Sequence, residues 1–371
     1  MHSTMNQIVT LDRNDTSARP AVVARVTRQQ IADDRAMLRT AAELTRDLIP
    51  PRPMVYWTDL IASVTIGYGA LAVAILVGSV GWALLAGVVA VLALYRAGSF
   101  IHELTHIKHA ALPGFRLGWN LLVGIPMLVP SFTYEGVHNL HHAKTRYGTA
   151  EDPEYLPLAL MKPYTLPLFV VASLLAPIAL LFRFAVVAPI SALVPQVRVF
   201  VVERYSGLAI NPSFRRRAPE GAFKVQWERL EAATSVWAIG LLTAVATGAI
   251  PLRGFLIFLA IASGVAVLNQ VRTLVAHLWE NDGEAMTVTA QYLDTVNVPP
   301  PALLPVLWAP VGLRYHALHH LLPGLPYHSL AEAHRRLSAA LEEHSPYHKA
   351  SYPGLPGLVS RLVRNTMGTV R

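Results

Sequence analysis

Long apolar runs separated by short polar or glycine-containing breaks dominate the pattern along this chain. Two of them, residues 60–79 and 81–101, are separated only by the break near residues 78–81, and Tyr56 and Trp57 precede the first run. About 20 apolar residues are enough for an α-helix to cross a bilayer, and Tyr and Trp are common at its interfaces. The pattern therefore predicts a tight hairpin of two membrane-spanning helices.

Two further spans are predicted at residues 230–250 and 254–276. The stretch 163–195 is also apolar, but prolines and one arginine interrupt it. These residues are Pro177, Arg183, Pro189 and Pro195. A single crossing there would put the histidine clusters that precede it and those that follow it on opposite faces of the membrane. We therefore expect interfacial helices or a re-entrant hairpin at 163–195, and four spans in total.

The distribution of basic residues indicates on which side of the membrane each loop lies. The loop before the third predicted span is rich in basic residues: Arg198, Arg204, Arg215, Arg216, Arg217, Lys224 and Arg229. Basic loops stay in the cytosol, whereas the uncharged turn near residues 78–81 belongs on the other side. The net charge of +8 is therefore assigned to the cytosolic face and its anionic lipids, and no nucleic-acid partner is expected.

Three regions follow from these spans. Residues 1–57 form a cytosolic segment without a signal peptide, in which residues 26–48 are predicted to be an amphipathic, solvated helix. Residues 58–348 form the membrane domain with its cytosolic cap, and residues 349–371 form a C-terminal tail. Within the cap, Ser329 and Glu332 match a capping box that opens a helix reaching about Glu343. The expected fold is all-α and integral to the membrane.

Composition restricts the chemistry. Hydrophobic residues make up 53% of the 371 residues and charged residues only 15%, which is typical of a bilayer protein. The chain contains no cysteine. Disulfides, thiolate zinc sites and iron–sulfur clusters are therefore excluded, and any metal must be held by His, Asp, Glu or Asn side chains.

Histidines occur in three clusters with helical spacing. The clusters comprise His102 and His106; His138, His141 and His142; and His316, His319 and His320. Residues three or four positions apart share one face of a helix, so each cluster can aim its imidazoles at one point. A His-x-x-His-His string should arise by chance about 0.02 times in such a chain, and here it occurs twice. These eight residues are predicted metal ligands. No role is assigned to His109, which lies just beyond the first cluster.

The number of ligands indicates two metal ions. Eight imidazoles are twice what one four-coordinate zinc requires, whereas two ions with four or five nitrogen ligands each would use all of them. Imidazole suits iron, and two irons with open positions can activate dioxygen. Ligand type alone leaves a zinc pair or a copper site open, although zinc supplies no redox chemistry.

The segments 102–106, 138–142 and 316–320, in this order and between these spans, resemble the three histidine boxes of the membrane fatty acid desaturase and hydroxylase superfamily. The resemblance extends from about Tyr56 to Glu343. It implies a four-helix membrane fold with a cytosolic cap and two irons held by the boxes. It also implies dioxygen as co-substrate and electrons from a separate ferredoxin or cytochrome b5. No haem-binding motif of a fused cytochrome b5 is present.

The resemblance adds two further residues to the predicted site. His277 follows the fourth span, where family members recruit a further histidine, so it is predicted as a ninth iron ligand. One branch of the family carries Asn four residues before this histidine; here Thr273 takes that place, and Asn281 is an alternative source of the amide. Asp152 is either a partner that orients a ligand or a solvated loop carboxylate.

The expected function is that of a desaturase, which introduces a double bond into a fatty acyl lipid at the cytoplasmic face of a bacterial inner membrane. A lipid hydroxylase of the same superfamily is the alternative. A weaker alternative is an intramembrane zinc protease, because His-Glu-x-x-His at residues 102–106 would supply Glu103 as a general base. A non-catalytic metal carrier is a third class, in which histidines would be distributed along a path through the spans.

Overall fold

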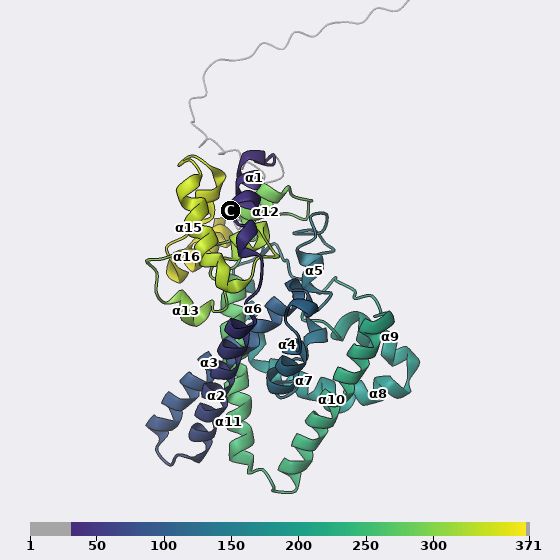
Figure 1. Cartoon of the computed structure of the whole chain (residues 1–371). Coiled ribbons are helices and arrows are strands. Elements are labelled where there is room, and N and C mark those ends of the chain that lie inside the picture. The colour runs from purple at the N-terminus through teal and green to yellow at the C-terminus, as the bar shows by residue number, and fades with distance from the viewer. Residues whose placement is uncertain (1–30, 369–371) are drawn as a thin grey trace, which may run out of the picture.

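Two long helical hairpins form the base of the molecule (Figure 1). The first joins α2 (Pro53–Leu76) to α3 (Val80–His106), and the second joins α10 (Gly221–Ala246) to α11 (Leu252–Leu274). The computed structural model describes residues 31–368, and within that range it contains helices and isolated bridges but no β-strand. The all-α prediction is confirmed.

Small residues allow the helices of the base to approach one another closely. A Cβ atom on Gly67 of α2 would lie 2.7 Å from a methyl carbon of Leu94 on α3, and one on Gly264 of α11 would lie equally close to Val91. Around these contacts Ala74 and Ala90 are buried. Helix α3 therefore packs closely on both α2 and α11.

The segment between the hairpins consists of helical pieces that follow one another directly. These are α6 (Thr165–Val171), η7 (Ala172–Leu175), α7 (Ala176–Phe182), η8 (Arg183–Val187) and α8 (Ala188–Leu193). With this segment, five described helices are long and apolar enough to cross a membrane, one more than the four predicted spans.

The contacts of this segment support an interfacial course. Its first part packs on α11 and its last part on α10. Leu166 at its start shares a core cluster with Trp279, near the predicted ninth ligand. Beyond its end, the backbone N–H of Leu208 donates to the carbonyl of Thr133, close to the second histidine cluster. The chain thus starts this segment on the histidine side and is back on that side by Leu208, as an even number of crossings requires. The count of four spans stays a prediction.

Buried arginines in this region have specific partners. Arg183 forms an ion pair with Glu231 of α10 at 2.5 Å, and Arg198 binds the other oxygen of the same carboxylate. Within the basic loop, the side chain of Arg216 is only 6% exposed. Its guanidinium donates to three backbone carbonyls and lies 4.2 Å from the ring centre of Trp227.

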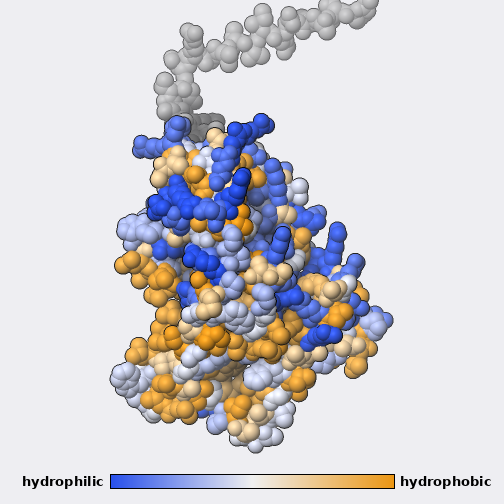
Figure 2. All heavy atoms as spheres, in the orientation of Figure 1, coloured by the Kyte–Doolittle hydropathy of each residue, from blue (hydrophilic) through white to orange (hydrophobic). Residues whose placement is uncertain are grey.

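A helical cap covers the end of the base at which the histidines lie. Its main helices are α1 (Arg35–Leu44), α12 (Val288–Asp294), α14 (His316–Leu321), α15 (Leu330–Ala340) and α16 (Leu355–Gly368). Further helices near this end are α4 (Phe115–Trp119), α5 (His138–His141), α9 (Pro195–Tyr205) and α13 (Pro305–Trp308). Figure 2 shows hydrophilic residues gathered over the cap and a hydrophobic band over the base.

The first and last cap helices are integrated into the core, contrary to the expectation of a solvated helix and a tail. Met37 and Ala41 of α1 are buried in one cluster with Leu318 of α14. Leu358 and Leu362 of α16 are buried beside the segment that follows α11. Residues 26–30 of the predicted first helix lie outside the described part of the chain.

The predicted capping box is also wrong. Helix α15 begins at Leu330 as expected, but Ser329 has helical backbone angles and its side chain makes no capping bond. A 3₁₀ turn, Tyr327–Ser329, leads directly into the helix, and the Ser329 hydroxyl instead contacts His328. Glu332 pairs with Arg335 and Arg336 rather than with the cap backbone.

Candidate metal centre

The histidines of all three boxes meet where the base joins the cap. The end of α3 carries His102 and His106, while α5 and α14 carry the other two boxes. His277 lies three residues beyond the end of α11. Together they form two groups, in each of which one nitrogen per residue lies within 4.8 Å of the others. The first group is His102, His106, His138, His142 and His319; the second is His141, His277, His316 and His320.

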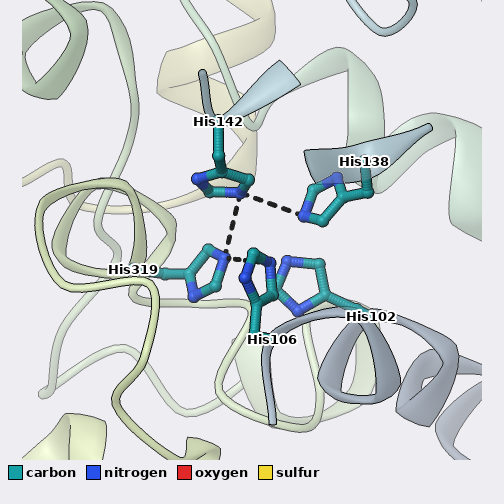
Figure 3. A group of neighbouring side chains, drawn as sticks. All are labelled: His102, His106, His138, His142 and His319. Carbon is teal, nitrogen blue, oxygen red and sulfur yellow. Dashed lines mark hydrogen bonds between the residues drawn. The ribbon is translucent and has the colours of Figure 1, made fainter. Parts of the chain in front are cut away.

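The rings of the first group point toward one another (Figure 3). The Nε2 atoms of His138 and His142 lie 3.0 Å apart, and the Nε2 atom of His319 lies 3.1 Å from those of both His106 and His142. His106 and His142 are half-buried, whereas the other three are buried. This group therefore has one edge toward the surface.

The second group is enclosed. All four of its residues are buried. The Nε2 atom of His316 lies 3.1 Å from that of His277 and 3.2 Å from that of His320. The ring of His142 stacks on that of His320, with 4.2 Å between their centres, so the two groups are neighbours.

The nitrogen spacings fit bound cations. Two nitrogens at right angles on an ion with bonds of about 2.1 Å are about 3.0 Å apart, close to the separations found in both groups. Both ring nitrogens of His102 are buried without a hydrogen-bond partner among the described residues. A buried polar atom is costly unless it is paired, and a metal ion would supply that partner.

A buried carboxylate fixes one ligand of the second group. The Nδ1 atom of His141 lies 2.9 Å from an Asp152 oxygen, and Asp152 is 0% exposed. The solvated-loop interpretation of Asp152 is therefore wrong, and the orienting one agrees with its position. Backbone N–H groups of Gly148 and Glu154 also donate to this carboxylate. With Nδ1–H directed at Asp152, the Nε2 lone pair of His141 is left for a metal.

Two similar relays were not predicted from the sequence. The Nδ1 atom of His138 lies 2.9 Å from Glu154, which also accepts a hydrogen bond from Tyr134. The second relay runs from His277 to Tyr147, at 2.8 Å, and on to Asp294, at 3.0 Å. Tyr147 and Glu154 lie in the polar run that follows the second box. This run is the feature of the sequence that could have indicated the two relays.

Comparison with known proteins agrees with this geometry. Residues 80–352 match the family described as fatty acid desaturase. The chain belongs to the fatty acid desaturase family. A curated relative, the ceramide hydroxylase of Caulobacter vibrioides (strain NA1000 / CB15N), is 49% identical over 324 residues, which cover 87% of this chain and 92% of the relative. The predicted resemblance is confirmed, and the chain is an integral membrane enzyme of the desaturase and hydroxylase superfamily.

One contact departs from the relays in this desaturase-family chain. The buried guanidinium of Arg272 on α11 lies 2.9 Å from the Nδ1 atom of His316. By contrast, Thr273 bonds to its own helix, and the Asn281 amide donates to the carbonyls of Gly148 and Glu284. Neither of these two residues makes a described hydrogen bond to a histidine, so Arg272 is the polar residue of α11 that reaches the group.

Burial sets the electrostatics of the histidines outside the spans. It lowers the pKa of His138, His142, His277, His316, His319 and His320 well below the ordinary value. Burial acts in the same direction on His141, but the nearby Asp152 carboxylate raises its pKa overall. A neutral imidazole has a free lone pair, which is the form that a metal requires.

Two residues of the first box region take no part in the groups. The Glu103 carboxylate is buried and accepts hydrogen bonds from the Tyr56 hydroxyl and the Tyr327 backbone N–H. It connects α2, α3 and the cap, which does not suit the general base of a protease. His109 lies in a separate 3₁₀ turn, where it contacts Arg116 at the surface.

Proposed function

We propose that this chain is a di-iron, dioxygen-dependent hydroxylase that acts on an acyl chain of a ceramide-type lipid. The observation that carries the proposal is the 49% identity to a ceramide hydroxylase over almost the full length of both chains. The convergence of nine histidines where the base joins the cap supports it.

Hydroxylation therefore replaces desaturation as the preferred reaction. Both reactions begin with removal of hydrogen from an unactivated carbon, and the outcome depends on how the chain is held beside the oxidant. The expectation of a desaturase followed the name of the superfamily, whereas the ceramide hydroxylase relative favours the alternative. A fatty acyl lipid remains the substrate class.

The nine histidines would hold two irons, five residues at one and four at the other. Bound iron supplies the redox chemistry for dioxygen activation. Asp152, Glu154 and Tyr147 each face the Nδ1 atom of one histidine and so keep its Nε2 atom directed at the metal position. Burial of all four residues of the second group would keep bulk water away from a metal held there.

Electrons come from a separate donor in this proposal, a ferredoxin or cytochrome b5 type protein. The half-buried His106 and His142 form the edge of the two groups that is nearest to the surface. Lys108 and Lys144, two residues after these histidines, are exposed. This edge is the natural entry for electrons from an acidic carrier. We place it on the cytoplasmic side of a bacterial inner membrane, in line with the positive-inside rule.

Lipid mass spectrometry of a ceramide-producing host that expresses the chain tests the proposal. We expect ceramides heavier by one oxygen atom, and none in a His319→Ala control. Ceramides or fatty acids lighter by two hydrogens would instead indicate desaturation. No change in any lipid, although the protein is iron-loaded and its donor is supplied, would contradict both reactions.

A further inference from the structure

An uncharged loop precedes the third histidine box. No charged residue occurs between Asp294 and Arg314, and the loop contains the short helix α13. Its aliphatic side chains are unusually exposed: Leu303 by 81%, Leu304 by 70%, Val306 by 55% and Leu307 by 46%. Soluble surfaces rarely carry such a contiguous apolar cluster, so it indicates an interaction site.

The base of this loop is firmly attached to the third box. The guanidinium of Arg314 donates to the carbonyls of Val298 and Ala302, each at 2.8 Å. The backbone N–H of Val298 donates to the carbonyl of Arg314 at 2.7 Å. Val298 and Arg314 therefore hold the two ends of a defined excursion side by side just before α14, and residues 299–308 are its first part.

The excursion packs against the membrane-spanning base and also against the cap, where Ala302 and Trp308 lie on the cluster that contains Leu358 of α16. Helix α13 contacts α3 and α11, and the Tyr95 hydroxyl donates to the Trp308 carbonyl at 3.1 Å. Figure 1 places α13 where the cap meets the base, and Figure 2 shows a hydrophobic patch at that place. On α3, Leu85 and Val88 are also more than half exposed, so apolar surface is present on both elements.

Helix geometry gives the depth of this contact. Tyr95 is 15 residues beyond the first residue of α3, Val80, and at 1.5 Å per residue it lies about 22 Å along the helix. The hydrocarbon core is about 30 Å thick. Side chains tilt toward the N-terminus of a helix, which here is the far side of the membrane. One residue further, Arg96 pairs with Asp59 and marks the polar boundary.

We propose that the α13 loop, residues 299–308, inserts into the bilayer leaflet on the histidine side and borders the route by which a lipid reaches the two histidine groups. The occupant of the patch is lipid because α13 packs on α3 near the polar boundary, on the histidine side of the apolar surface of that span. The second half of the proposal rests on the proposed lipid substrate; the insertion itself does not.

A depth measurement tests the insertion without any activity. The chain has no cysteine, so Leu304→Cys and a matched control, Ala339→Cys at an exposed position of α15, each give one site for a spin label. The labelled proteins are reconstituted in vesicles of phosphatidylcholine and phosphatidylglycerol. We expect the Leu304 label to be more accessible to oxygen than to a water-soluble nickel complex, and the Ala339 label to show the reverse.

Two results would overturn the insertion. One is a Leu304 label as accessible to nickel as the Ala339 label. The other is dipolar broadening between Leu304 labels at low protein density, which would assign the patch to a second copy of the chain.

Kinetics test the route. Leu304→Asp with Leu307→Asp should raise the KM for vesicle-embedded ceramide about tenfold or more, because a charge is costly at this depth. The kcat and the iron content should stay unchanged, and Ala339→Asp should have no effect. An unchanged KM in a protein that hydroxylates ceramide would refute the route, whereas absence of hydroxylation in the parent protein would refute the proposed function instead.

Discussion

The residues behind the histidines distinguish one ligand from another. Three imidazoles face a carboxylate or a tyrosine with their Nδ1 atoms, and His316 faces the guanidinium of Arg272 instead. A carboxylate partner fixes the tautomer and strengthens the imidazole as a ligand. The four ligands of the second group are therefore chemically unequal, although all are histidines.

Asp152→Asn should weaken metal binding while leaving the fold intact. The amide has nearly the same shape but no charge to orient His141, and loss of such a partner typically costs about 10- to 100-fold in metal affinity. Competition with a chelator measures this. The neighbouring Glu151→Gln is the control, because Glu151 is exposed and its ion-pair partner among the described residues is Arg146, at the surface rather than at a histidine. Equal affinities of the two variants would remove Asp152 from the site.

His277→Ala tests the predicted ligand outside the boxes. Removal of one of four nitrogens from the second group should lower iron from about two toward one per chain and abolish hydroxylation. His344→Ala, at an exposed side chain beyond α15, should change neither. Full iron content and full activity in the His277→Ala protein would leave the site with eight histidines.

The sequence was sufficient to find the ligands but not their partners. Box spacing is local, so His138 and His141 could be assigned from a few neighbouring positions. Asp294 and Arg272 reach the site from segments more than 100 residues beyond the second box, and only tertiary packing brings them there. The same packing directs the Asn281 amide to backbone carbonyls rather than to a histidine.

The spans were predicted well in their apolar parts and poorly at their ends on the histidine side. Helix α2 begins at Pro53 rather than near residue 60, and α10 begins at Gly221 rather than near 230. Hydropathy detects only the part of a helix that lies in hydrocarbon. The first turns of α10 carry Lys224 and Glu228, which pair with each other outside that part.

Cysteine labelling tests the course of the helices. Cysteines at Ser79 and Pro251, both exposed in the hairpin turns, should react with an impermeant thiol reagent added from outside. A cysteine at Arg217 should not react, because an even number of crossings precedes it. Arg217 is exposed, unlike the buried Arg216, so lack of reaction reports topology rather than burial. Labelling of the Arg217→Cys protein from outside would mean that residues 165–193 cross the membrane.

At the scale of the whole molecule, the two hairpins and the cap bring together segments that are far apart in sequence. The box pattern and the parity of the spans predicted that the histidine clusters would share one side of the membrane, and the nine histidines of the two groups do meet in one region of the molecule. The contributions of α1 and α16 to the cap could not be predicted. An amphipathic helix has the same pattern of apolar and polar residues whether its apolar face lies on a membrane or on a protein core. The burial of α1 and α16 attaches these first and last described helices to the core of the cap.

The central claim is that nine histidines hold two irons, and elemental analysis of the purified protein tests it most directly. After expression with iron supplied, we expect about two irons per chain and little zinc. The His102→Ala and His320→Ala variants, one from each group, should each lose about half of the iron. One zinc and no iron per chain, unchanged in these variants, would contradict the account.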